Sequence, residues 1–115
     1  MQSVLVVEDD MDIRSALQGF LTDEGYNVIT AENGKAGLQL MEKEKPGLVL
    51  LDLMMPVMNG WEFLEEKSHS EANAKVPVLV ISAVPGNPSI PGALGFLKKP
   101  IDLDRLIDFV ELYCQ

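Results

Sequence analysis

The chain has 115 residues and a formal net charge of −9 at pH 7. This length predicts one domain with a single core, and the negative charge argues against direct binding to nucleic acid. No apolar stretch approaches the roughly 20 residues of a membrane span and no export leader is evident, so we expect a cytoplasmic protein without a membrane partner. The only cysteine, Cys114, cannot form an internal disulfide.

Strand and helix patterns alternate along the chain. Short apolar runs predict five strands, at residues 3–7, 26–30, 48–51, 78–81 and 95–97. Apolar residues at helical spacing predict helices that begin after Asp10, Asn33, Asn59 and Asp102. The first of these helices should end at Gly25, the second before Pro46, and the third within the polar residues 68–70.

This alternation predicts an α/β fold with a doubly wound parallel sheet and right-handed crossovers. A ligand crevice is then expected at the carboxyl ends of the central strands. The fourth crossover, at residues 83–93, should be short or irregular. It contains Pro85, Pro88 and Pro91, and each proline removes a backbone donor that a helix needs.

Acidic residues follow two of the predicted strands. Glu8, Asp9 and Asp10 follow the first strand, and Asp52 ends the third. Any one of these acids could simply cap the next element. Four carboxylates in one crevice, however, would repel one another strongly unless a cation were present. Oxygen-only ligands favour Mg²⁺ over zinc, since the chain offers one distant cysteine and one histidine on a polar helix.

Two further polar residues lie at the ends of the fourth and fifth predicted strands. Lys99 follows the fifth strand, and strand alternation should direct one of Lys98 and Lys99 toward the crevice. The bond before Pro100 is a candidate for a cis peptide. Ser82 ends the fourth strand and could donate a hydroxyl. A surface lysine and a small residue that closes a strand are the simpler interpretations of these two positions.

Four segments together resemble the receiver domain of two-component response regulators. They are VLVVEDD (4–10), LLDLMMPVMNG (50–60), VISA (80–83) and FLKKP (96–100). The second segment is highly specific, and the resemblance runs the length of the chain. It implies a flavodoxin-like sheet with strand order 2-1-3-4-5 and a single receiver domain over residues 1–115. It also implies a signalling protein rather than an enzyme.

The resemblance implies a role for each matching residue. Asp52 would accept a phosphoryl group from a histidine kinase or phosphotransfer protein, and a downstream protein would read the result. Mg²⁺ would be held by Glu8, Asp9, Asp52 and the backbone carbonyl of Met54. Ser82 would be the switch hydroxyl, Lys99 the phosphate-binding lysine, and Phe96 the switch aromatic. Phe96 could equally be a permanently buried core ring.

The sequence departs from the family between Ser82 and Lys99, where it is about a turn and a half shorter than typical members. We therefore expect the usual output face to be altered, in a chain that acts either alone or as part of a longer protein. A haloacid dehalogenase-type phosphatase would need a second acid where Met54 stands, and a dinucleotide-binding enzyme would need glycines where the acidic cluster stands. The alternative that remains is a protein-interaction module of the same fold that works without phosphate.

Overall fold

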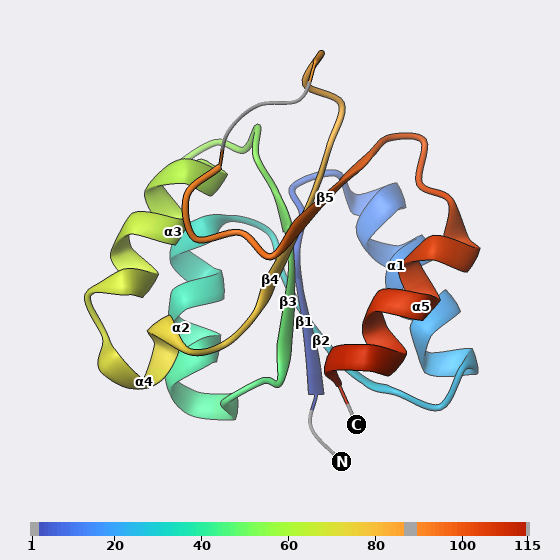
Figure 1. Cartoon of the computed structure of the whole chain (residues 1–115), viewed down its shortest axis with the longest axis horizontal. Helices are drawn as coiled ribbons and strands as arrows, with labels where there is room; N and C mark the ends of the chain where they lie inside the picture. Colours follow the sequence, from blue (N-terminus) through green and yellow to red (C-terminus); the bar gives the residue numbers. More distant parts are fainter. Residues whose placement is uncertain (1–2, 87–89, 115) are drawn as a thin grey trace.

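Five parallel strands form one twisted sheet in the order β2-β1-β3-β4-β5 (Figure 1). The computed structural model describes residues 3–86 and 90–114. The strands are β1 (Ser3–Val7), β2 (Asn27–Ala31), β3 (Leu48–Asp52), β4 (Val78–Ser82) and β5 (Gly95–Lys98). The doubly wound sheet and its strand order confirm the predicted fold class.

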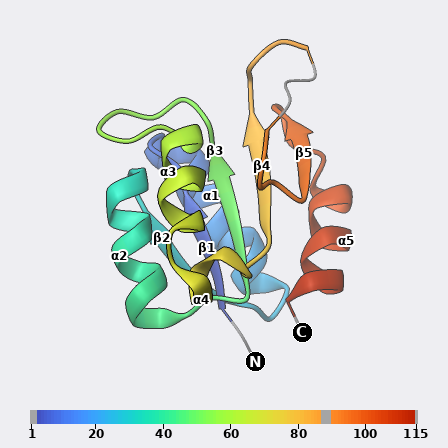
Figure 2. The same cartoon turned by 60° about the vertical axis from the view of Figure 1, so that its left-hand side comes forward.

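Helices cover both faces of this sheet (Figures 1 and 2). They are α1 (Met11–Asp23), α2 (Gly34–Glu44), α3 (Gly60–Ser68), α4 (Glu71–Ala74) and α5 (Leu103–Tyr113). The α1 and α5 helices lie on one face, and α2 and α3 lie on the other. No helix among the described residues is long and apolar enough to cross a membrane.

Helix starts are determined by side-chain caps that the sequence shows directly. Asp10 accepts a hydrogen bond from the Ile13 amide, and Asn33 accepts one from the Ala36 amide. Asn59 and Glu62 form a reciprocal capping box at the start of α3. Capping satisfies amides that have no partner inside the first helical turn, which explains why these helices begin where they were predicted.

The central strands are buried on both faces because helices pack against each of them. Every residue of β3 is buried, as are Val4 to Val7 of β1. Successive side chains of a strand point to opposite faces, so the core divides into two clusters. Leu50 and Ile81 belong to the cluster under α1 and α5, whereas Val49 and Val80 belong to the cluster under α2 and α3.

Two local features differ from the sequence expectations or lie beyond them, and a third confirms an expectation. The β2 strand spans Asn27–Ala31, one residue later than predicted. The short α4 helix, which begins after its cap Ser70, was not predicted; four residues are too few to show a helical apolar period. Between β4 and β5 the described residues contain turns and bends but no helix, as the prolines predicted, and Pro88 lies outside the described residues.

Candidate functional site

The acidic turn after β1 places three carboxyl groups in different surroundings. Glu8 is fully buried, whereas Asp9 and Asp10 are exposed. The Asp10 side chain caps α1, and the Asp10 amide donates to Glu8 Oε2 at 3.2 Å. Asp10 therefore has a structural role, which leaves Glu8 and Asp9 available to the crevice.

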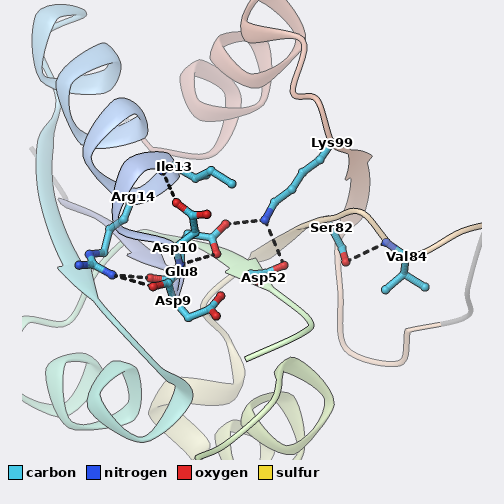
Figure 3. Close-up of polar contacts among 9 residues, drawn as sticks. All are labelled: Glu8, Asp9, Asp10, Ile13, Arg14, Asp52, Ser82, Val84 and Lys99. Carbon is cyan, nitrogen blue, oxygen red and sulfur yellow. Dashed lines mark hydrogen bonds and ion pairs between the residues drawn. The ribbon is translucent and has the colours of Figure 1, made fainter. Parts of the chain in front are cut away.

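Arg14 fixes the backbone of this turn, and the sequence reasoning did not identify it. Its guanidinium donates to the carbonyl oxygen of Glu8 at 2.9 Å and to that of Asp9 at 3.4 Å (Figure 3). These bonds hold the backbone of the two acids and do not involve their carboxylates. The only signal in the sequence is a basic residue one helical turn after the N-cap Asp10.

Lys99 connects the acidic turn to the end of β3. Its ammonium group lies 2.7 Å from Glu8 Oε1 and 3.5 Å from Asp52 Oδ1 (Figure 3). Of the adjacent lysines, Lys99 enters the crevice and Lys98 is exposed, as strand alternation predicted. The peptide bond between Lys99 and Pro100 is cis. Of the two carboxylates, Glu8 is thus the closer partner of the Lys99 ammonium group.

Burial dominates the electrostatics of this group of charges. It raises the pKa of Glu8 to about 7, although the hydrogen bond from Lys99 opposes the shift. Burial likewise raises the pKa of Asp52, despite the nearby charge of Lys99. Burial alone would lower the pKa of Lys99, but the hydrogen bond to Glu8 and the charge of Asp52 outweigh it and the pKa is raised. Burial thus opposes ionisation of both carboxyl groups, and Lys99 offsets this effect only in part.

The donor set fits a hard divalent cation. Among the described residues, Glu8, Asp9 and Asp52 each bring one carboxylate oxygen within 4.8 Å of the others. Mg²⁺ prefers oxygen ligands and commonly keeps several waters, so a few carboxylates at an open cavity suit it. Exposed Asp9 provides the solvent-facing side of this set.

A cavity of about 580 Å³ opens above these residues at the carboxyl ends of the strands. It is lined by the acidic turn, by Asp52 and Lys99, and by Ile13, Met54, Trp61, Ser82, Ala83, Val84 and Pro85. Met54 is two residues beyond Asp52 in the loop before α3. The structure therefore brings every proposed metal and phosphate residue to one cavity, with the exception of Phe96.

Ser82 and Phe96 lie in different surroundings. The Ser82 side chain is buried, and its Oγ accepts a hydrogen bond from the Val84 amide at 3.2 Å (Figure 3). Phe96 is half-buried against the core cluster under α2 and α3, and it lines a separate cavity of about 180 Å³ with Ile90 and Ala93. Because Phe96 is neither fully buried nor exposed, this packing is compatible with both interpretations of the ring.

The family model for the response regulator receiver domain matches residues 4–111. The chain belongs to this family. Receiver domains are the phosphoryl-accepting signalling modules of two-component systems, and they bind Mg²⁺ at an acidic pocket.

Relatives and solved structures agree with this assignment. The chain is 33% identical to sporulation initiation phosphotransferase F of Bacillus subtilis, with 97% of this chain and 93% of the relative covered. It is 33% identical to the probable transcriptional regulator ycf29 of Porphyra purpurea, covering 95% of this chain and 54% of that protein. Chemotaxis protein CheY4 of Vibrio cholerae superimposes with a TM-score of 0.86 at 30% identity, covering 98% of both chains. The chain therefore spans nearly the whole of some relatives but only about half the length of others.

Proposed function

We propose that Asp52 is the residue that accepts the phosphoryl group in this receiver. The carrying observation is the position of its carboxylate, which ends a central strand, faces the cavity and lies 3.5 Å from the Lys99 ammonium. An exposed surface acid would lack both the neighbouring cation and the acidic partners. Glu8 and Asp9 supply those partners within the same group of oxygens.

Mg²⁺ would be held by Glu8, Asp9, Asp52 and the backbone carbonyl of Met54. When bound, it supplies positive charge that offsets the phosphoryl oxygens and the crowded carboxylates. Arg14 serves this arrangement indirectly, because its bonds to the carbonyls of Glu8 and Asp9 fix the turn from which both carboxylates project.

The transfer uses the carboxylate of Asp52 as a nucleophile. An oxygen of Asp52 forms a bond to phosphorus while the bond from phosphorus to the donor histidine breaks, and the histidine nitrogen keeps that electron pair. The product is an aspartyl phosphate with more negative charge than the original carboxylate. The Lys99 ammonium group can then move away from Glu8 and toward the phosphoryl group on Asp52.

A conformational shift follows from this change in charge. The Ser82 hydroxyl can turn from the Val84 amide toward the phosphoryl oxygens, and this movement alters the packing of the chain after β4. Phe96 can respond by moving further into the core, since it is only half-buried in the observed packing. The signal is then a population shift between two packings of one fold.

We infer the biological setting from the family. The donor would be a sensor histidine kinase or a phosphotransfer protein, and the output would be a contact with a downstream protein. We further propose that residues 1–115 form one receiver domain, that it acts in the cytoplasm, and that it makes no direct contact with nucleic acid or membrane. The net charge of −9 supports the absence of nucleic-acid contact.

A phosphorylation assay tests this function. The chain is incubated with acetyl phosphate or a phosphorylated kinase, with and without Mg²⁺, and the adduct is located by mass spectrometry. We expect an adduct on wild type that requires Mg²⁺ and disappears in Asp52→Asn, with Asp10→Asn as the matched control that retains it. An unmodified wild type, or the same adduct on Asp52→Asn, would refute the proposal and favour the phosphate-independent module.

A further inference from the structure

The described residues of the β4–β5 connection form no helix, and a groove lies beside α3. In a right-handed doubly wound sheet, the connection from β4 to β5 belongs on the same face as α2 and α3. Among the described residues this face carries only the short segment 90–94 at that position, which packs through Ile90 and Ala93 (Figures 1 and 2). A cavity of about 460 Å³ lies between this segment and α3.

The α3 wall of this groove is one stripe of the helix. Its lining residues are Trp61, Leu64, Glu65 and Ser68, and the facing wall is Pro91 and Gly92. The α3 positions follow the spacing i, i+3, i+4 and i+7, which places them on a single helical face. Trp61 is 38% exposed, so a large aromatic surface remains accessible in the groove. Grooves of this kind receive the apolar face of a partner helix.

Charge selects the kind of partner. The exposed charged residues of α3 are Glu62, Glu65 and Glu66, all acidic. The one lysine of this helix, Lys67, is buried and donates to the Ala74 carbonyl at 3.2 Å, so it brings no cation to the surface. The segment 90–94 carries no charge. A second copy of this chain would bring like charges together, whereas a basic partner would be attracted.

We propose that the groove between α3 and the segment 90–94 binds a partner helix whose apolar stripe is flanked by lysine or arginine. Trp61 lines both this groove and the cavity that contains Asp52. A helix seated on Trp61 therefore contacts the same ring that borders the acidic site. This link between groove and phosphorylation rests on the proposed function, whereas binding of the helix to the groove does not.

A model peptide tests the groove without any phosphoryl donor. The probe is a labelled synthetic helix of leucine and lysine with leucines at i, i+3, i+4 and i+7, and binding is followed by fluorescence anisotropy. We expect a scrambled peptide of the same composition to bind about tenfold more weakly. Trp61→Ala and Glu65→Lys should each weaken binding of the patterned peptide about tenfold. Glu44→Lys, the same charge change at the end of α2, should alter it less than about twofold.

Three results would overturn this proposal. Equal binding of the scrambled peptide, or equal weakening by Glu44→Lys and Glu65→Lys, would show attraction by net charge alone. Sedimentation that reveals a dimer dissociated by Trp61→Ala would assign the groove to a second copy of this chain. Glu65 and Glu44 are exposed and Trp61 is 38% exposed, so circular dichroism should show folded variants, and loss of binding by a folded variant then reports on the groove.

Beryllofluoride then tests the link to the phosphoacceptor site. Its addition should change peptide affinity by about threefold or more in wild type and not in Asp52→Asn, which corresponds to a modest coupling between two sites. An unchanged affinity would overturn the link through Trp61. The adduct assay on Asp52 separately decides the proposed function, so the two failures are distinguishable.

Discussion

The acidic turn and the start of the β4–β5 connection both lie at the carboxyl ends of the strands, but the strands that support them are packed very differently. The acidic residues follow β1 and β3, which have paired strands on both sides and buried side chains. The connection ends at β5, which is an edge strand, and its described residues are exposed or half-buried. The comparison indicates that this fold can lose the crossover helix next to its outermost strand, β5, while the geometry of the central site is retained.

The largest expected difference concerns two glycines, one in each region. A Cβ at Gly60 would lie 2.8 Å from the Asp52 carbonyl oxygen and 2.8 Å from Leu53 Cα, so the loop after Asp52 would have to move. We expect Gly60→Ala to lower the free energy of unfolding by about 3 kcal/mol. A Cβ at Gly86 meets nothing within 4 Å, and only its φ of +79° opposes a side chain, so Gly86→Ala should cost about 1 kcal/mol.

Urea denaturation of the two variants measures this difference directly. Because both changes add one methyl group, they form a matched pair. If the two variants lose the same stability, the central site is no more tightly constrained than the edge connection, and the comparison fails.

The second effect is loss of metal affinity in the central region. We expect Asp9→Ala to weaken Mg²⁺ binding about 100-fold, since it removes one of three carboxylate ligands. Titration followed by Trp61 fluorescence measures this affinity, because Trp61 borders the same cavity. Asp10→Asn removes a neighbouring charge without removing a proposed ligand and should weaken binding less than about fivefold. Comparable losses in both variants would contradict the ligand assignment.

The third effect is a dependence of stability on pH that originates at Glu8. Its pKa of about 7 in the folded protein exceeds its ordinary value of 4.5, so the folded state binds this proton more tightly. The contribution of Glu8 to the free energy of unfolding should therefore be greatest below pH 4.5, and it should be lost as pH rises through about 7. The full loss is about 3 kcal/mol.

Glu8→Gln should remove most of this fall, because a neutral amide cannot ionise. At pH 8 without Mg²⁺ we expect the variant to be about 2 kcal/mol more stable than wild type. Thermal or urea unfolding from pH 5 to 8 gives the two curves. Parallel curves would show that the buried carboxylate does not carry the pH dependence.

The smallest effect is expected in the β4–β5 connection. Pro85→Ala and Pro91→Ala should each change the free energy of unfolding by no more than about 1 kcal/mol, since neither residue belongs to a helix in the described part of the connection. Hydrogen exchange should show weak amide protection in this connection and strong protection in β3. Beryllofluoride should raise protection near Ser82. Strong protection throughout the connection before activation would contradict the contrast between the two regions.

Local sequence patterns were sufficient to predict most elements of the fold. The apolar run before Asp52 predicted a buried central strand, and Asp10, Asn33 and Asp102 predicted helix starts that the structure confirms. These signals work because a strand or cap depends on residues only a few positions apart. The three prolines similarly predicted the absence of a regular fourth crossover helix, and the described part of that connection agrees. The identity of the family came from the four matching segments rather than from periodicity.

Tertiary packing decided the features that depend on distant residues. Glu8 and Lys99 are 91 positions apart, and only the packing of the strands brings their charged atoms to 2.7 Å. The sequence indicated that both residues belong to the site, but not that Glu8 rather than Asp52 would be the closer partner of Lys99. The contacts of Arg14 and the groove beside Trp61 could not be predicted from the sequence either. Composition, caps and periodicity act along the chain, whereas burial, charge pairing and open surface are determined by which segments meet in space.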